Sequence, residues 1–395
     1  MLFFRQRGNH QMYKLNGFRD LEQIAKFLGS SATNNMVINE VVFDSRQAKK
    51  NSLFIPLKGE QFDGEEFVQD CLNRGAACLS MNSHEGAVIQ VPNVYTALLK
   101  LAQQKLENLS PVTFFITGSY GKTTIKDMLK FFIGADCHAT SSNENNEFGI
   151  PFTILSMPES AKFLVVECGA RKQWDFEEIS SILKCDVFIL TGIAGNHLET
   201  FGSIKEIENT KLQLRHSLRN QANFIDGRII QETNYERFNK LLVEQALSLI
   251  NLEKEIHNDD FVPSSGRGNE IQLYEGKIID HTYNASPHTM VSTASKYDPK
   301  ETILILGDMA ELGDTEDKLH LSTLNELKEY QIFVTGNIFK KVFSKADSKQ
   351  LTYFQGITDF PKDIFVKLLK EGKNLYFKGS RSSKMENYIE ALIND

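Results

Sequence analysis

One short stretch limits what this chain can fold into, the glycine-rich segment Thr117-Gly118-Ser119-Tyr120-Gly121-Lys122-Thr123-Thr124. An apolar run, 112–116, precedes it, and a helical pattern, 125–133, follows it. In a strand, turn and helix of this kind, the backbone N–H groups at the start of the helix bind phosphate oxygens. Lys122 is then expected to reach the outer phosphates, and the Thr123 hydroxyl to hold Mg²⁺. The segment predicts a nucleotide-phosphate loop.

The spacing of this segment is shorter than the usual pattern, which has a glycine five residues before the Gly-Lys pair. Here the nearest preceding glycine is Gly118, three residues before Gly121. A Gly-Lys-Thr turn with a purely structural role is the alternative interpretation. The strand before the segment and the helix after it favour the phosphate loop.

Composition narrows the class of protein. A chain of 395 residues, 41% hydrophobic and 24% charged, is typical of a soluble globular protein with two or three domains. A net charge of −7 argues against a nucleic-acid partner, which needs a basic footprint. The five cysteines form no C-x-x-C pair, so we expect buried thiols in a reducing compartment. We find no signal peptide and no apolar run of membrane-spanning length, which predicts a cytoplasmic protein.

Two later segments place candidate metal ligands at strand ends. Glu167 follows the apolar run 163–166, and His197 follows a second run, 187–191. Carboxyl ends of parallel strands meet at the ligand-binding edge of an open sheet. Hard oxygen ligands beside nucleotide phosphates favour Mg²⁺ over a transition metal. A lone histidine in the core or on the surface is the alternative for His197. A further candidate, Lys211, lies in a helix predicted over 203–219.

Strands alternate with helices along the whole chain, which predicts an α/β protein with parallel sheets. A small α/β region runs to about residue 108, a second begins at Pro111, and the last third, from Lys300, predicts a doubly wound sheet. Ser45 and Arg46 follow a strand of the first region and are candidates for holding a diphosphate. A surface turn with a solvated arginine is the alternative there.

Taken in order, the motifs resemble those of the Mur ligase family, most closely the MurF type that joins D-Ala-D-Ala to UDP-MurNAc-tripeptide. The family's T-G-S-x-G-K-T-T loop accounts for the short spacing. The other matching segments are Asp44-Ser45-Arg46, Lys58-Gly59-Glu60, Asp63-Gly64, Asn145-Asn146-Glu147-Phe148-Gly149-Ile150-Pro151, Glu167-Cys168-Gly169-Ala170, 197–203, Tyr283-Asn284-Ala285 with Pro287, 307–313 and 378–381.

The resemblance implies a three-domain architecture. Residues 1–109 would form an N-terminal α/β domain that binds the UDP-linked substrate. Residues 110–298 would form a shortened central P-loop domain that binds ATP, and residues 299–395 a Rossmann-like C-terminal domain that binds the amino substrate. The implied partners are a UDP-linked muramoyl peptide and an amino acid or dipeptide, with no nucleic acid and no membrane span, in a monomer.

The resemblance also implies the chemistry. ATP would phosphorylate a substrate carboxylate, an amine would attack the acyl phosphate, and ADP and phosphate would leave. Positioning and charge neutralisation dominate such phosphoryl transfer. The implied catalytic residues are Lys122, His197 and Lys211, the last carbamylated. The implied ATP-binding residues are Gly118, Ser119, Gly121, Lys122, Thr123, Thr124, Asn239, Arg267, Asp280 and His281. The implied Mg²⁺ ligands are Thr123, Glu167, His197 and Lys211. The implied substrate-binding residues are Ser45, Arg46, Asn145, Asn146, Tyr283, Asn284, Lys378 and Arg381.

Three departures separate this chain from the family pattern. His281 stands where the family has the acidic residue expected at the ATP ribose. Arg267 follows Lys211 by only 56 positions, and parts of the adenine-contacting motif have no match, which leaves Asn239 as the candidate for its second asparagine. Lys211 is followed by Leu212-Gln213 where the family has x-Glu.

These departures leave alternatives to an active peptidoglycan-precursor ligase. One is a paralogue that acts on another carboxylate substrate. Another is a catalytically degenerate protein that binds a UDP-sugar or a partner. A simple P-loop GTPase or kinase would leave the N-terminal and C-terminal motifs unexplained.

Overall fold

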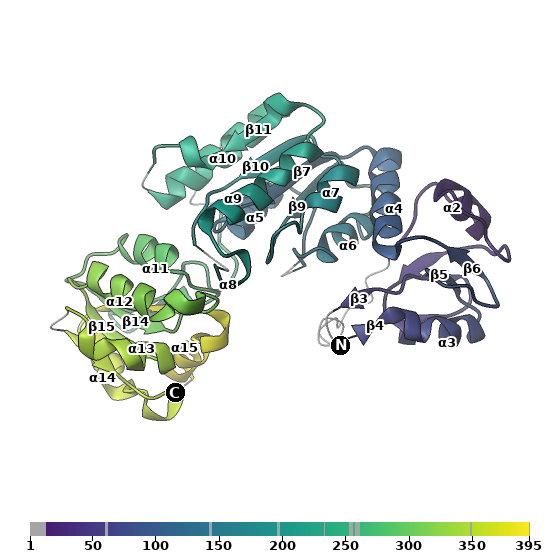
Figure 1. Ribbon diagram of the computed structural model, residues 1–395. Helices are drawn as coiled ribbons and strands as arrows, with labels where there is room; N and C mark the ends of the chain where they lie inside the picture. Colours follow the sequence, from purple (N-terminus) through teal and green to yellow (C-terminus); the bar gives the residue numbers. More distant parts are fainter. Residues whose placement is uncertain are drawn as a thin grey trace.

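Three sheets, one for each third of the chain, organise the molecule (Figure 1). The computed structural model describes residues 13–59, 62–141, 144–195, 198–232, 234–252, 256, 261–347 and 350–394. We refer to the parts built on these sheets as the N-terminal, central and C-terminal units. Figure 1 shows the central unit between the other two. The α/β class with parallel sheets is confirmed.

The N-terminal unit is a small parallel sheet in the order β1-β2-β5-β6. Its strands are β1 (Glu40–Val42), β2 (Ser52–Phe54), β5 (Ala77–Ser80) and β6 (Val88–Gln90). Helices α2 (Leu21–Phe27) and α3 (Val68–Asn73) accompany it, with a two-stranded pair, β3 (Lys58–Gly59) and β4 (Phe62–Asp63). All of β2 is buried, as expected for a strand covered on both faces.

A long helix, α4 (Val94–Leu109), joins the N-terminal and central units. The Asn93 side chain caps it by accepting a hydrogen bond from the Thr96 N–H. Near its other end, the buried Lys105 amine donates to the carbonyls of Lys14 (3.2 Å) and Leu155 (2.6 Å), which belong to the two different units. One hydrophobic core runs through both units, so α4 fixes them to each other.

The central unit is a five-stranded parallel sheet in the order β11-β10-β7-β9-β8. Its strands are β7 (Val112–Thr117), β8 (Cys137–Ala139), β9 (Phe163–Glu167), β10 (Val187–Leu190) and β11 (Phe224–Asp226). Its helices are α5 (Lys122–Ile133), α6 (Gly149–Leu155), α7 (Glu177–Ile182), α8 (Leu198–Phe201), α9 (Ile204–Leu212) and α10 (Tyr235–Leu249). The helix predicted over 203–219 is shorter in the structure, because a 3₁₀ segment, Gln213–Ser217, follows α9.

Alternate residues of β7 enter different cores. Phe114 packs in the cluster formed with α5 and α10, and Phe115 in the cluster formed with α4, α6 and α7. Both faces of the sheet are therefore covered, and the ligand-accessible part is the edge where the strands end. The phosphate loop leaves the central strand at that edge.

The C-terminal unit has a six-stranded sheet in the order β12-β13-β17-β14-β15-β16. Its strands are β12 (Asn269–Leu273), β13 (Gly276–His281), β14 (Thr302–Gly307), β15 (Gln331–Thr335), β16 (Leu351–Tyr353) and β17 (Asn374–Lys378). Its helices are α11 (Pro287–Ala294), α12 (Glu316–Glu326), α13 (Asn337–Val342), α14 (Lys362–Lys370) and α15 (Glu386–Ile393). The β12–β13 pair is antiparallel, and the other pairs are parallel.

This sheet begins before the predicted division at residues 298 and 299, which stays a prediction. Strands β12 and β13 hydrogen-bond to β17 and not to the central sheet, so the C-terminal unit includes residues from Asn269 onward. The strand-turn-strand pattern over 270–279 is confirmed as this hairpin.

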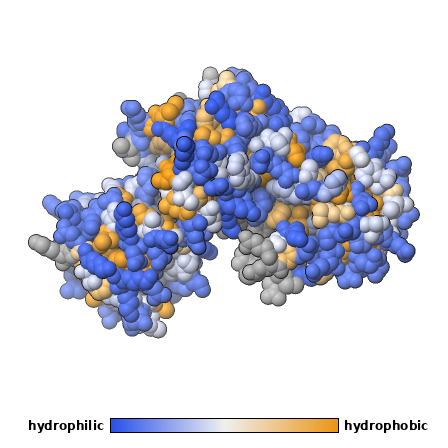
Figure 2. Space-filling model, in the orientation of Figure 1, coloured by the Kyte–Doolittle hydropathy of each residue, from blue (hydrophilic) through white to orange (hydrophobic). Residues whose placement is uncertain are grey.

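The surface and the thiols agree with the composition. The face shown in Figure 2 is largely hydrophilic, with apolar side chains in small groups. All five cysteines are buried free thiols, as predicted. Across the described ranges, none of the helices has both the length and the apolar character that a membrane crossing requires.

Candidate functional site

Two glycines give the phosphate loop its shape. Gly118 has φ +151° and Gly121 has φ +76°, backbone conformations that residues with a side chain rarely adopt. A Cβ on Gly118 would collide with the Thr191 hydroxyl. Ser119 anchors the loop to the segment after β10, because its N–H donates to Gly192 O (2.8 Å) and its hydroxyl to Ala194 O (2.9 Å). The loop is thus held open at the N-terminus of α5, where phosphate oxygens bind.

A carboxylate stands directly beside this helix terminus. Glu167 ends β9, in register with Ile116 of β7. One of its oxygens accepts a hydrogen bond from the Thr123 hydroxyl and the other from the Asn145 amide, each at 2.7 Å. The strand order therefore brings two of the predicted ligands of Mg²⁺ together, as expected for residues at neighbouring strand ends.

Lys122 begins α5, and its amine folds back onto the loop. Its Nζ donates to the Gly118 carbonyl at 2.7 Å. Burial lowers the pKa of Lys122, and the nearby Glu167 carboxylate opposes that effect. A phosphate group would supply the compensating negative charge that this enclosed amine lacks.

Lys211 lies near the end of α9, with only 3% of its surface exposed. Burial lowers the pKa of Lys211 well below its usual range, the Lys122 amine lowers it further, and Asp175 acts in the opposite direction. Among the described residues it forms no ion pair. His197, the other predicted catalytic group of this region, lies outside the described residues.

A cleft of about 780 Å³ brings most of the predicted site residues together. Its walls come from the central unit on one side and the C-terminal unit on the other. The predicted residues that line it are Gly118, Ser119, Gly121, Lys122, Thr123, Thr124, Asn145, Asn146, Glu167, Lys211, Asn239, Arg267, His281, Tyr283, Asn284, Lys378 and Arg381.

The C-terminal wall is built around four of these residues. The Arg267 guanidinium lies over the Tyr283 ring, 3.8 Å from its centroid. Lys378 ends β17, and its Nζ donates to the Asn284 carbonyl at 2.9 Å. Burial lowers the pKa of Lys378 to about 7, with a smaller contribution from the Arg267 charge.

Three buried polar atoms of the cleft residues lack hydrogen-bond partners among the described residues. They are Asn239 Oδ1, Arg267 Nε and His281 Nε2. Burial also lowers the pKa of His281 well below its usual range, so its imidazole is neutral at pH 7. Buried polar atoms are nearly always paired, so these three are the atoms that a polar ligand in the cleft would satisfy.

Some predicted residues do not contribute a side chain to the cleft. Ser45 and Arg46 lie in the N-terminal unit, where Arg46 pairs with Asp44 (Nε to Oδ1, 2.8 Å). The Asp280 carboxylate accepts hydrogen bonds from the N–H and hydroxyl of Thr282 and stabilises the turn after β13. Their roles in ligand binding stay predictions.

Two cleft residues have structural partners as well. The Asn146 amide oxygen accepts from the Gly149 N–H at the start of α6. The Arg381 guanidinium pairs with Glu386 at 3.3 Å. Asn146 therefore supports the loop before α6, and its predicted contact with substrate stays a prediction.

Sequence reasoning missed the contacts that join the two walls. The Tyr120 ring, inside the phosphate loop, packs against His288 of α11 at 4.6 Å, and Lys296 pairs with Glu236 of α10 at 3.3 Å. An aromatic residue, Tyr120, at the variable position of the loop motif was the one sequence signal for the first contact. The pair of Lys296 with Glu236 joins residues far apart in the sequence, and no local pattern indicates it.

The cleft is basic although the protein is acidic. Seven basic residues line it: Lys122, Arg171, Lys211, Arg267, Lys296, Lys378 and Arg381. Three acidic residues line it: Glu167, Glu236 and Glu311. An excess of positive charge in a cleft attracts anionic ligands.

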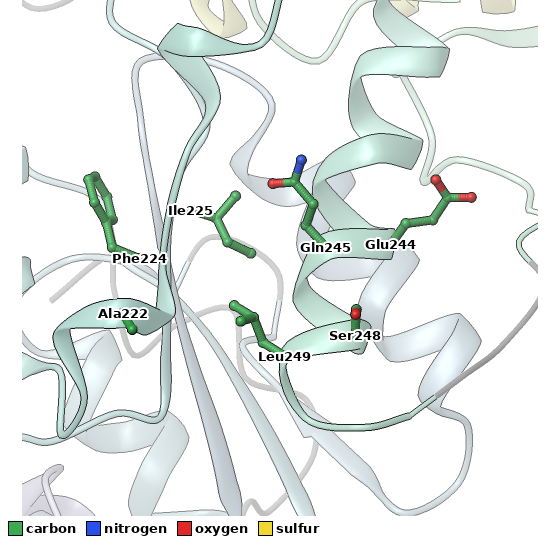
Figure 3. A pocket seen from close by; sticks show the side chains of 7 residues that line it. All are labelled: Ala222, Phe224, Ile225, Glu244, Gln245, Ser248 and Leu249. Atoms are coloured by element: carbon green, nitrogen blue, oxygen red, sulfur yellow. The ribbon is translucent and has the colours of Figure 1, made fainter.

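A second cavity, of about 490 Å³, lies at the outer edge of the central sheet (Figure 3). Ile225 of β11 and Leu249 of α10 point toward each other across it, and Glu244 points away. It is lined by Ala222 and Phe224 at the start of β11, whereas the phosphate loop follows the end of β7. It contains none of the predicted site residues, so we assign the chemistry to the larger cleft.

A covered parallel sheet with a phosphate loop at the end of its central strand is the architecture of P-loop nucleotide-binding proteins, and by fold and site this chain is one of them. Residues 116–286 match the model of the Mur ligase middle domain. The UDP-N-acetylmuramoyl-tripeptide--D-alanyl-D-alanine ligase of Bacillus subtilis is 27% identical over 456 aligned positions, which cover 95% of this chain and 98% of that protein. The enzyme of the same name from Rickettsia prowazekii is 26% identical over 441 positions, covering 92% and 97%.

Solved structures agree on the fold. MurF from Acinetobacter baumannii superposes with a TM-score of 0.77 at 21% identity, covering 97% of this chain and 99% of that one. MurF from Thermotoga maritima, in complex with ADP, superposes with a TM-score of 0.76 at 23% identity, covering 89% and 96%. The middle part of the chain is therefore similar to the Mur ligase middle domain, and almost the whole chain is similar to MurF enzymes. The alignment with the Bacillus protein is longer than this chain, so that relative carries residues that are missing here.

Proposed function

We propose that this protein is an ATP-dependent amide ligase that joins D-Ala-D-Ala to UDP-MurNAc-tripeptide, with ADP and phosphate as the other products. The relatives that align over almost the full chain carry that activity in their names. The cleft supports the same chemistry, because it combines a phosphate loop with a basic wall on a second unit. In this reaction the tripeptide carboxylate becomes an acyl phosphate that the dipeptide amine attacks.

The observation that carries the proposal is the arrangement at the start of α5. Lys122 and the helix N-terminus would bind the outer phosphates of ATP. The Glu167 carboxylate, 2.7 Å from the Thr123 hydroxyl, would stand beside those phosphates and hold Mg²⁺ there. Phosphoryl transfer depends mainly on positioning and on neutralising charge, and these residues provide both.

The residues at this point fit Mg²⁺. Thr123 Oγ1 and the Glu167 carboxylate are adjacent hard oxygen donors, and Mg²⁺ in such sites keeps one or two protein ligands beside phosphates and water. When bound, Mg²⁺ neutralises phosphate charge. His197 is the proposed ligand of a second Mg²⁺ ion.

We propose that the Lys211 amine is carbamylated. A carbamate forms on the uncharged amine, and the burial that lowers the pKa of Lys211 favours that form. The product would be an anion beside the phosphate loop, where it would hold a metal and orient Lys122. Within the described part of the chain, no ion pair occupies this amine and competes with its modification by CO₂.

The two substrates would enter from opposite units. Ser45 and Arg46 would bind the UDP end at the N-terminal unit, and Lys378 and Arg381 would bind the dipeptide at the C-terminal unit. The orphaned atoms of Asn239, Arg267 and His281 are assigned to the adenine and ribose of ATP. We also propose that the enzyme acts as a monomer in the cytoplasm, where ATP is available.

The test is phosphate release from ATP with Mg²⁺ and UDP-MurNAc-tripeptide, with and without D-Ala-D-Ala. Release that needs both substrates, and that is lost in Lys122→Ala, supports the ligase. ATP-dependent release with a different carboxylate or amine would assign the chain to a paralogue. Binding of the UDP-peptide without binding of ATP would identify a degenerate binder and overturn the proposal.

A further inference from the structure

Amide formation requires a proton acceptor in the cleft. A dipeptide amine arrives largely as an ammonium, because an α-amino group has a pKa of about 8. An ammonium has no lone pair and does not attack an acyl phosphate. A group able to take this proton is therefore expected among the residues that line the C-terminal wall.

Lys378 has the required position. It ends the central strand β17, with His281 of β13 and Leu306 of β14 as its register neighbours. Only 5% of its surface is exposed, yet it lines the cleft. Within the described residues, its side-chain amine donates a hydrogen bond to the Asn284 carbonyl, at 2.9 Å. A carbonyl accepts from an amine in either protonation state, so this contact orients Nζ without requiring its charge.

The groups that face Lys378 do not hold it in the charged form. Arg267 is a second cation nearby, and the charge of Lys296 also acts on His281. Within the described residues, Asp280 is the carboxylate that opposes this effect, and it accepts a hydrogen bond from the Thr282 hydroxyl in the turn. His281, the register neighbour on β13, is buried and neutral. No carboxylate in the described ranges forms an ion pair with Lys378.

We propose that Lys378, as the free amine, is the catalytic base that deprotonates the incoming ammonium, and that His281 is a positioning residue that keeps Lys378 without a counter-ion. This inference rests on the proposed function. An acidic side chain at position 281 would instead form a lateral pair with Lys378 and hold its proton.

The proton balance is complete without a further reactant. The ammonium transfers one proton to Lys378 and becomes the free amine. Its nitrogen then forms the C–N bond while the C–O bond to phosphate breaks, and the second proton leaves with the departing group as hydrogen phosphate. Lys378 returns its proton to water through the open cleft. Since burial lowers the pKa of Lys378 to about 7, close to that of the substrate ammonium, this transfer is nearly balanced.

Hydroxylamine separates this role from the rest of the reaction, because it is largely unprotonated at neutral pH and needs no base to attack an acyl phosphate. At saturating D-Ala-D-Ala, where weaker dipeptide binding no longer contributes, we expect Lys378→Met to lower kcat by about 100-fold or more, in the range of general-base catalysis, while hydroxamate formation stays within a few-fold of wild type. A loss confined to the KM for D-Ala-D-Ala would show a binding role and overturn the role as base. Retained hydroxamate formation also shows that the variant folds and binds ATP. Equal losses with both nucleophiles would overturn the role of Lys378. A wild-type enzyme that forms no hydroxamate would overturn the acyl phosphate, and with it the proposed function.

The pH profile tests His281. At saturating ATP and substrates, we expect His281→Asp to move the acidic limb of turnover upward by about one pH unit, so that activity falls about fivefold at pH 7 and recovers at higher pH. His281→Asn adds no charge and is expected to leave the limb in place. The ionisation of the dipeptide is the same with the wild type and both variants, so it does not account for a difference between their pH profiles. An unchanged limb in His281→Asp would overturn the proposed link between the two residues.

Discussion

At the scale of single residues, the phosphate loop depends on Gly118. Its φ of +151° and its closeness to the Thr191 hydroxyl leave no room for a Cβ. We therefore expect Gly118→Ala to distort the loop and weaken ATP binding by about 100-fold, since strain of about 1–3 kcal/mol adds to the steric conflict. Isothermal titration with ATP measures this loss. Gly134→Ala is the matched control, because Gly134 also has a positive φ (+91°) but nothing within 4 Å of the added carbon. Equal effects of the two changes would show that backbone strain alone matters.

Lys211 gives a second prediction at this scale. If its carbamate is the functional group, Lys211→Ala should lower turnover by about 100-fold or more, the cost typical of removing a charge-stabilising group. Short-chain carboxylic acids should restore part of that activity by occupying the vacated space. Lys205→Ala, at an exposed position of the same helix, should have no such effect. Loss in Lys211→Ala without acid-dependent rescue would leave the lysine essential but would contradict the carbamate.

At the scale of elements, α11 links the C-terminal unit to the cleft. Its N-terminus is a capping box: the Thr289 N–H donates to the Ser286 hydroxyl, and the Ser286 N–H donates to the Thr289 hydroxyl at 3.0 Å. We expect Ser286→Ala to lower the free energy of unfolding by about 1 kcal/mol, measured by urea denaturation. Ser295→Ala, at the other end of the helix, is the control. A cost near zero in Ser286→Ala would mean that packing alone defines the start of α11.

Local elements were predictable where their chemistry is local. The strand before the phosphate loop, the loop and the helix after it follow from an apolar run, two glycines and a helical period, and the structure has them at Val112–Thr117 and Lys122–Ile133. The hairpin over 269–281 was also predictable, but its sheet was not. Strand β13 pairs with β17, which comes much later in the chain, and no local pattern encodes that pairing.

The same limit applies to the site. Glu167 and Thr123 were expected to meet, because strand ends share one edge of a parallel sheet. The lateral contact of His281 with Lys378 and the orphaned atoms of the cleft depend on how distant segments pack. Asn146 shows the opposite case: it was predicted to contact the substrate, and its side chain also accepts a hydrogen bond from the backbone at the start of α6.

At the scale of the whole molecule, a basic cleft lies in a protein of net charge −7. These two features make opposite predictions for the anionic substrates, since net charge would repel them and the cleft would attract them. Salt screens both effects over about 8–10 Å, so the sign of the salt dependence shows which one controls binding.

We expect the cleft to dominate, because its charges contact the ligand while most of the acidic residues lie farther away. The KM for the UDP-linked substrate should therefore rise several-fold as ionic strength increases from about 0.05 to 0.5 M, where the screening length falls to about 4 Å. Arg171→Gln, at the exposed end of the cleft, should reduce this dependence, whereas Lys340→Gln on α13 should leave it unchanged. A KM that falls with added salt would show that long-range repulsion by the acidic surface outweighs the cleft. Steady-state kinetics at constant ATP and Mg²⁺ distinguish the two outcomes.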